Sequence, residues 1–138
     1  MSTNEHQRIL LVDDNHIFRE TLAQRLRDAG YQVATAETGE RAFLALRDWI
    51  HPVDWLYTRA KLPGLIDGTI LADEYHDSHA DRAAIIAAPE SRTSQQGHII
   101  LQQPALPAVL NLLMHMIKAD LLQMPVARAA MGDQRHAA

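Results

Sequence analysis

The stretch RILLVDD, residues Arg8 to Asp14, joins an unbroken apolar run to a pair of acids. An apolar run without alternation is typical of a strand that is covered on both faces, as in a parallel sheet. The run therefore predicts a buried first strand. Because the acids follow it directly, we expect Asp13 and Asp14 at the carboxyl end of that strand.

From Asn15 onward the apolar residues recur at helical spacing, and Gly30 follows as a stop signal. Short apolar runs and helical patterns then alternate along the chain. Further strands are expected at residues 31–36, 52–58, 83–88 and 98–103, and further helices at 37–50, 66–79 and 104–122. In the helix at 37–50, the side chains expected to face the core are Ala42, Leu46, Trp49 and Ile50.

Strands that alternate with helices predict an α/β fold in which a parallel sheet lies between two helical layers. The functional crevice of such a sheet lies beyond the carboxyl ends of its strands. We expect one domain over residues 8–122, a flexible N-terminus at 1–7, a disordered tail at 123–138 and no second folded domain. The positions selected for the crevice are Asp13, Asp14, Arg59, Ala87, Ala88, Gln103 and Pro104.

The composition argues against several classes of protein. The 138 residues carry a formal charge of −4 and no basic block, so nucleic-acid binding has little electrostatic support. There is no cysteine, which excludes disulfides and thiol nucleophiles. The N-terminus MSTNEHQ is polar, and no apolar run approaches the roughly 20 residues that span a bilayer. These features predict a cytoplasmic protein without a nucleic-acid or membrane partner.

Three stretches together carry a resemblance to a known family. In this order and at these separations, ILLVDDN, DWLYTRAKLPG and ILQQP resemble the response-regulator receiver domain of two-component signalling. The resemblance covers residues 8–122 and implies a flavodoxin-like (CheY-like) three-layer sandwich with five parallel strands. It also implies phosphoryl transfer from a phosphohistidine to an aspartate at the end of the third strand. Magnesium on the acid pair, a hydroxyl after the fourth strand and a lysine after the fifth would assist that transfer.

Position by position, this chain keeps only part of that chemistry. Asp13 and Asp14 match the acid pair, but the acceptor position, four residues before Pro63, holds Arg59. A guanidinium is always protonated and has no nucleophilic oxygen. Asp54 does not replace the acceptor, since it opens the strand at the other end of the sheet. The other degenerate positions are Ala87 for the hydroxyl, Gln103 for the lysine and Ile100 for the aromatic switch residue.

The chain is also shorter than the family between Ala87 and Gln103, where most of the fourth helix would stand. The segment PESRTSQQG, residues 89–97, is a poor helix former because Pro, Ser, Thr and Gly crowd it. We therefore expect a shortened or missing fourth helix.

The charges at the strand ends suggest a role for Arg59. Two adjacent carboxylates repel each other, and a receiver relieves this repulsion with a divalent cation. The planar guanidinium suits bidentate pairing with Asp13 or Asp14. We predict this ion pair in place of magnesium, which leaves a vestigial metal site and no cofactor. The alternative is that Arg59 points to solvent.

The last predicted helix is apolar around an unusually wide arc. Its apolar residues cover about 200°, whereas packing one face needs roughly 100°. The excess predicts a protein partner on this helix, with a homodimer as the expected form. The alternative is that the chain itself covers the surplus. The candidate interface residues are Leu106, Val109, Leu112, Leu113 and Met116.

Histidines raise two further hypotheses. His76 and His79 lie one helical turn apart with Asp77 between them, a spacing that can share a metal ion. A solvated polar face is the favoured interpretation of this group. His115 lies on the polar stripe of the last helix, but nothing around it resembles a phosphotransfer histidine.

The sequence therefore favours a non-enzymatic, atypical receiver domain, or pseudo-receiver, that lacks the phosphoacceptor aspartate. It would act in signal transduction by phosphorylation-independent protein–protein interaction or dimerisation. Two alternatives stay open. One is a magnesium-dependent receiver that is phosphorylated on a non-standard acceptor. The other is a small-ligand-binding flavodoxin-like domain, although DDNHIF lacks the glycines of a phosphate loop.

Overall fold

The computed structural model describes residues 6–90 and 93–134, and for residues 123–134 it describes the backbone alone. The chain divides into two compact units, residues 1–106 and 107–138. The first unit holds the sheet and three helices, and most of one long helix forms the second. None of the helices in the described ranges is long and apolar enough to cross a bilayer.

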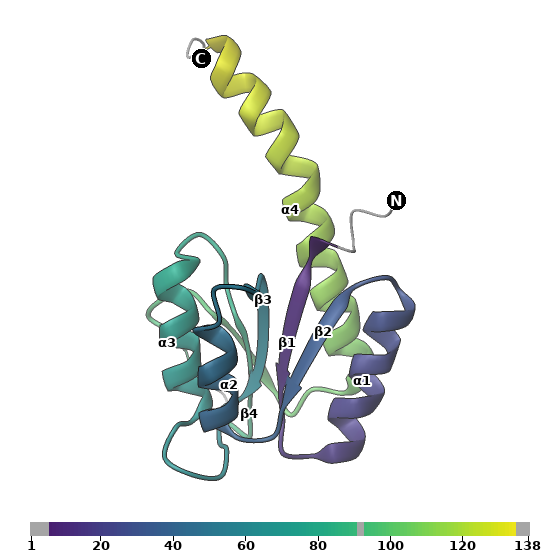
Figure 1. The fold of residues 1–138 in the computed structure, drawn as a ribbon, viewed down its shortest axis with the longest axis vertical. Coiled ribbons are helices and arrows are strands. Elements are labelled where there is room, and N and C mark those ends of the chain that lie inside the picture. The colour runs from purple at the N-terminus through teal and green to yellow at the C-terminus, as the bar shows by residue number, and fades with distance from the viewer. Residues whose placement is uncertain (1–5, 91–92, 135–138) are drawn as a thin grey trace. The chain divides into compact units, whose positions relative to one another are not determined.

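The first unit is a parallel sheet with helices on both faces (Figure 1). All five strands are parallel and follow the order β2-β1-β3-β4-β5. This confirms the predicted α/β fold with five parallel strands. The elements are β1 (Arg8–Val12), α1 (His16–Asp28), β2 (Gln32–Ala36), α2 (Gly39–Leu46), β3 (Trp55–Arg59), α3 (Gly68–Ser78), β4 (Ile85–Ala88), β5 (Ile99–Gln102) and α4 (Leu106–Gln134).

Strand β1 lies inside the sheet because its apolar run can be buried on both faces. Its residues from Ile9 to Val12 are fully buried, with β2 paired on one side and β3 on the other. Leu10 and Val12 belong to the core that includes residues of α2 and α3. Side chains alternate along a strand, so Ile9 and Leu11 face the opposite side. That side carries α1 (Figure 1).

Local sequence signals fix where the helices of the first unit begin. A side-chain oxygen before each helix accepts a hydrogen bond from a backbone N–H in the first turn, as helix caps require. Gly30 follows α1 with a φ of 99°, a left-handed conformation that confirms the predicted stop signal. The capping residues are Asn15 for α1, Thr38 for α2 and Asp67 for α3.

Helix α2 is shorter than predicted. It ends at Leu46, and the prediction that Trp49 and Ile50 face the core is wrong, since they are 85% and 65% exposed. Asp48 explains the early end. Its carboxylate accepts hydrogen bonds from the N–H groups of Ile50 at 3.0 Å and His51 at 3.3 Å. An aspartate that bonds ahead to the backbone in this way favours a turn over a helix.

The connection from β4 to β5 contains no helix in its described parts, residues 89–90 and 93–98. Over those residues the missing fourth helix is confirmed. The chain instead turns at Gly97, whose φ is 82° and whose N–H donates to the Ser94 carbonyl at 3.3 Å. β5 then follows as an edge strand of the sheet.

Helix α4 continues to Gln134, past the predicted end at Leu122. The structure thus differs from the expected disordered tail over residues 123–134, and residues 135–138 lie outside the described part of the chain. Alanines at positions 127, 129 and 130 favour a helix in this segment, whereas Pro125 and Gly132 oppose it.

The first half of α4 shows the predicted polar stripe. Asn111, His115 and Lys118 are exposed. Of the candidate interface residues, Val109 and Leu113 are buried, and Leu106, Leu112 and Met116 are partly exposed.

Candidate functional site at the carboxyl ends of the strands

The register of the sheet brings candidate residues from several strands to one edge. Val12 pairs with Thr58, and Arg59 pairs with Ala87. Asp13, one residue beyond Val12, therefore stands level with Arg59. A cavity of about 360 Å³ opens at this edge. Residues lining it include Asp13, Asn15, Tyr57, Arg59, Ala87 and Gln103. We call this cavity the strand-end site.

Asp13 is the buried acid of the strand-end site, with 1% of its surface exposed. Its Oδ1 accepts a hydrogen bond from the Asn15 N–H at 2.8 Å, and its Oδ2 accepts one from the Tyr57 hydroxyl at 3.0 Å. Burial raises the pKa of Asp13, while these two hydrogen bonds and the charge of Arg59 oppose the rise. Both oxygens of this carboxylate are thus already engaged within the chain.

Arg59 lies beside both acids. Its Nη1 is 3.8 Å from Asp13 Oδ1, and its Nε is 3.9 Å from Asp14 Oδ1. Both distances exceed hydrogen-bond range, so the contacts are ion pairs and differ from the expected bidentate geometry. The Arg59 side chain is 42% exposed and Asp14 is 50% exposed, whereas Asp13 is buried. The guanidinium thus bridges a buried and an exposed carboxylate by charge.

Two residues that were not predicted from the sequence hold Asp13 in place. Tyr57 donates to its carboxylate, and Arg19 donates from Nη1 to its backbone carbonyl at 2.8 Å. The sequence position of each residue could have indicated its role. Tyr57 precedes Arg59 by two residues, so the two side chains share one face of the strand. Arg19 is one turn after Asn15 and is 8% exposed, which makes it a charged residue on the core-facing stripe of α1.

The backbone at the end of β3 is fixed by a close approach from α3. A Cβ atom at Gly68 would overlap the Arg59 carbonyl oxygen, so only glycine fits at this position. The Gly68 N–H donates to the Ala60 carbonyl at 3.0 Å, and the Ala60 N–H donates to the Ala87 carbonyl at 2.8 Å. These contacts fix the backbone position from which the Arg59 side chain extends at the end of β3.

The loop after β3 is anchored to α2 through Glu40. The Glu40 carboxylate accepts a hydrogen bond from the Leu65 N–H at 2.8 Å. This bond is the main reason why the pKa of Glu40 lies below its ordinary value. Gly64 has a φ of 93° and passes close to the same carboxylate, where a side chain would collide. The LPG turn is therefore a fixed loop over the carboxyl edge of the sheet.

Among the described residues, the opposite wall of the strand-end site offers neither an aliphatic hydroxyl nor an ammonium group. Ala87 is 7% exposed and pairs with Leu101. Gln103 has a φ of 46°, which is unusual for a residue with a side chain. Its N–H donates to the Ala88 carbonyl at 3.0 Å, and its Nε2 donates to the Pro89 carbonyl at 3.3 Å. The side-chain amide of Gln103 is therefore already bound to a backbone carbonyl of this chain.

Other predicted positions lie elsewhere. Ile100 lines a different cavity, and His115 is exposed on α4. Nδ1 of His76 and Nδ1 of His79 are buried and accept no hydrogen bond from the described residues. Among those residues, no group of three or more metal-binding side chains comes together, so the structure gives the metal hypothesis for His76 and His79 no support.

Known receiver proteins resemble this chain in sequence or in fold. No protein-family model matches the chain. A response regulator receiver protein from Anaeromyxobacter sp. (strain Fw109-5) is 39% identical over 80 residues, or 58% of this chain. The matched chain spans 32% of the length of that relative.

Solved structures of receiver domains share the fold. A receiver domain protein from Methanospirillum hungatei JF-1 has a TM-score of 0.72 at 19% identity and covers 85% of this chain and 98% of its own. The non-phosphorylated HemR receiver domain from Leptospira biflexa has a TM-score of 0.68 at 25% identity, with 80% and 94% covered. TrrA from Thermotoga maritima, solved with Mg²⁺ and BeF, has a TM-score of 0.63 at 25% identity, with 80% and 98% covered.

Proposed function

We propose that the chain is a receiver-like (CheY-like) domain of two-component signalling that works without accepting a phosphoryl group, and its fold and sequence likeness support the first part of this proposal. The observation that carries the proposal is Arg59 at the carboxyl end of β3, within 4 Å of both acids. Phosphoryl transfer to this position needs a carboxylate oxygen as nucleophile, and a guanidinium has none.

The acid pair also fits a magnesium ion poorly. Magnesium prefers oxygen ligands in near-octahedral geometry. Asp13 offers two oxygens that already accept hydrogen bonds from Asn15 and Tyr57. Arg59 supplies a fixed positive charge at 3.8 Å and 3.9 Å from the two acids. The cation that would balance these carboxylates is thus part of the chain.

The remaining family positions support the same proposal. Oxygens of a transferred phosphoryl group need donors or cations to neutralise their charge. Ala87 supplies no hydroxyl, and the Gln103 amide is bound to the Pro89 carbonyl. A domain of this kind is not an enzyme. Its output must come from a protein partner, since a conformational equilibrium shifts only when a ligand prefers one of its states.

The experiment is incubation with acetyl phosphate and Mg²⁺, followed by intact-mass measurement. We expect no adduct on the wild-type chain, while a receiver with a complete acceptor set serves as the positive control. Arg59→Asp alone should also stay unmodified, because Ala87 and Gln103 remain. The triple change Arg59→Asp, Ala87→Thr and Gln103→Lys should give an acid-stable, base-labile adduct. A phosphate adduct on the wild-type chain would instead establish a receiver with a non-standard acceptor.

A homodimer through α4 is the proposed form of self-association. Leu106, Leu112 and Met116 are partly exposed apolar residues on this helix, next to the exposed polar stripe at Asn111. We expect Leu112→Glu to weaken a dimer by about tenfold or more, because it places a charge in an apolar contact. Asn111→Glu is the matched control and should leave association unchanged. Sedimentation velocity at several concentrations checks this, and a strict monomer at all of them contradicts it.

Small-ligand binding at the strand-end site is the second candidate function. The observation in its favour is that the Arg59 guanidinium makes no hydrogen bond to any described residue, although it faces a cavity of about 360 Å³. A thermal-shift screen of nucleotides and flavins tests it. Stabilisation that Arg59→Met abolishes would favour this function over partner binding alone.

A further inference from the structure

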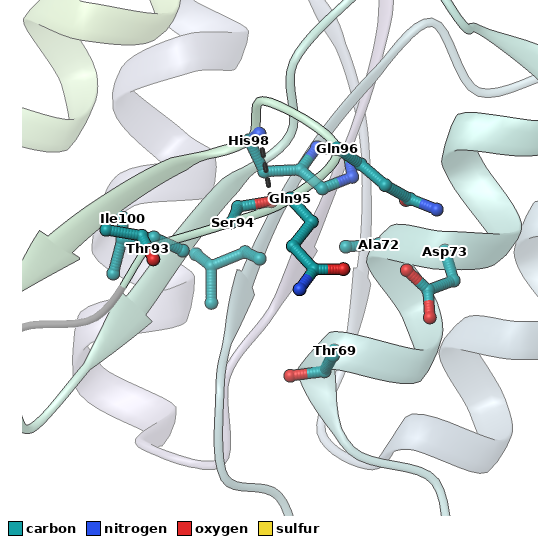
Figure 2. A pocket seen from close by; sticks show the side chains of 10 residues that line it. Thr69, Ala72, Asp73, Thr93, Ser94, Gln95, Gln96, His98 and Ile100 are labelled. Carbon is teal, nitrogen blue, oxygen red and sulfur yellow. Dashed lines mark hydrogen bonds between the residues drawn. The ribbon is translucent and has the colours of Figure 1, made fainter.

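Two further cavities open on the first unit. Figure 2 shows one of about 380 Å³ between α3 and the segment before β5, where the Ser94 hydroxyl accepts a hydrogen bond from the His98 N–H at 3.2 Å. This cavity adjoins residues 91 and 92, which lie outside the described part of the chain. The other cavity, of about 390 Å³, is lined by residues of the described ranges. It lies between the end of α2, residues 47–53 and α3, and we call it the α2–α3 groove.

The α2–α3 groove has an apolar base and an exposed aromatic rim. Val53 at its base is buried, and Leu46 and Pro52 extend the apolar lining. Trp49 also belongs to the lining, yet 85% of its surface is exposed. The volume of the groove lies within the range of about 300–1,000 Å³ that is typical of small-molecule sites. The groove can therefore hold one aromatic side chain.

Trp49 is held in this exposed position by the turn that ends α2. The Asp48 carboxylate accepts hydrogen bonds from the backbone N–H groups of Ile50 and His51, and His51 Nδ1 lies 3.2 Å from its second oxygen. These contacts fix the backbone around Trp49. A segment that is ordered before binding loses less conformational entropy when a partner covers it. Tryptophan buries about 150–250 Å² and is enriched among the residues that dominate protein interfaces, so Trp49 is a suitable anchor.

A second copy of the chain fits this surface, because the surface carries both a protruding group and a groove. A twofold contact joins the same patch on each chain, so the patch must be complementary to itself. Trp49 is the protruding group, and the groove lies beside it. Arg47 and Glu74 supply both signs of charge, with Nη1 3.5 Å from Oε2 and side chains that are 61% and 26% exposed. Because this ion pair is weak and open to solvent, each member can pair with its counterpart on a second chain.

The charge of the chain argues against two other occupants of the groove. The formal charge is −4, and Asp48 and Glu74 place two carboxylates in the lining. These charges repel an anionic lipid surface and an acidic peptide. A second copy of the chain instead brings the Arg47 guanidinium to the carboxylates.

We propose that the α2–α3 groove is a self-association surface in which Trp49 of each chain enters the groove of the other. The indole lies on the apolar lining residues Leu46, Pro52 and Val53. Arg47 of each chain pairs with Glu74 of the other. This contact is separate from the proposed homodimer through α4 and does not depend on it. Because one aromatic anchor per chain carries the contact, we expect a Kd on the order of 10 µM to 1 mM.

Sedimentation velocity and tryptophan fluorescence test the contact on the full chain with Leu112→Glu, in which the α4 contact does not contribute. With concentration up to about 1 mM, we expect the sedimentation coefficient to rise and the emission to shift to the blue. The shift reports Trp49, because Trp55 is buried throughout. Trp49→Ala should weaken association by about tenfold or more.

The matched control is Leu65→Ala, which also removes a large exposed side chain but lies outside the lining, and it should leave association unchanged. A strict monomer at every concentration would overturn the proposal, and so would association that Trp49→Ala does not weaken. Failure of the α4 homodimer is a different result, since the wild-type chain and Leu112→Glu would then associate equally.

Charge exchange tests the reciprocal pairing of Arg47 with Glu74. Arg47→Glu alone and Glu74→Arg alone should each weaken self-association by about tenfold, because like charges then face each other across the twofold axis. An equimolar mixture of the two variants should associate more tightly than either alone, since each chain meets an opposite charge on the other. A mixture that associates no better than its components would refute the pairing. Vesicles of phosphatidylcholine and phosphatidylserine should leave the emission unchanged, and a blue shift with vesicles in a monomeric chain would assign the groove to a membrane instead.

Discussion

The strand-end site and the surroundings of His98 hold their buried polar groups in different ways. At the strand-end site, both oxygens of Asp13 accept hydrogen bonds and a guanidinium stands within 4 Å. The buried His98 ring is instead held by a backbone group, since its Nδ1 accepts a hydrogen bond from the Ala84 N–H at 2.8 Å. The first site thus balances charged side chains against one another, whereas the second region positions a histidine ring through the backbone.

Removing the Tyr57 hydroxyl should have one of the two largest effects on stability. Tyr57→Phe takes a hydrogen bond from the buried Asp13 carboxylate, and a bond to a charged group contributes about 1.5–3 kcal/mol. Tyr75→Phe is the matched control, because its hydroxyl donates to the neutral Asp54 carbonyl at 2.7 Å and should contribute about 0.5–1.5 kcal/mol. Urea unfolding measures both. A smaller loss for Tyr57→Phe than for Tyr75→Phe would show that the bond to the Asp13 carboxylate is not the stronger of the two.

Substitution of two glycines compares the tightly packed backbone at the end of β3 with the open loop before β5. Gly68→Ala forces a methyl group against the Arg59 carbonyl and should destabilise the fold by up to about 3 kcal/mol. Gly97→Ala meets no atom within 4 Å and bears only the cost of its left-handed φ, about 1 kcal/mol. The same unfolding experiment ranks them. If Gly97→Ala proves the more damaging, the loop is the more rigid of the two regions.

The smallest expected effect is a pH dependence from His98. Because burial lowers its pKa in the folded chain below the ordinary value, the unfolded chain binds the proton more readily. Stability is therefore present above the ordinary pKa of 6.5 and is lost as the pH falls through the lower folded value. The pKa of His79 is lowered as well, so the His98→Asn variant should keep part of the pH dependence of stability. His98→Asn should flatten the curve of unfolding free energy against pH, and parallel curves for the two proteins would contradict this.

Much of the fold could be predicted because the decisive signals are local. The run Ile9–Val12 is buried on both faces as its unbroken apolarity predicts, and Gly30 ends α1 as expected. The segment at 89–97 forms no helix where the structure describes it, in line with its composition. The error at Trp49 and Ile50 arose because helical spacing continues past a turn that the Asp48 side chain stabilises.

The site was harder to predict, since its geometry depends on contacts between distant residues. Strand register alone could place Arg59 near Asp13 and Asp14. The Arg59 guanidinium lies 3.8 Å from an Asp13 oxygen and 3.9 Å from an Asp14 oxygen, beyond hydrogen-bond range. This geometry depends on the hydrogen bonds that Tyr57 and Asn15 already donate to the Asp13 oxygens. The hydrogen bond from the Ala84 N–H to His98 Nδ1 joins residues fourteen positions apart, and the sequence gives no pattern for it.

Titration with Mg²⁺, followed by ¹H–¹⁵N NMR at residues 12–15 and 57–60, shows directly whether Arg59 takes the place of a metal ion beside Asp13 and Asp14. We predict no saturable shifts at millimolar Mg²⁺ in the wild-type chain, because Arg59 already supplies the positive charge beside the two acids. Arg59→Met should show saturable binding, while Arg47→Met, which removes an exposed arginine from α2's end, should behave like the wild type. Saturable Mg²⁺ binding at Asp13 and Asp14 in the wild-type chain would contradict the account.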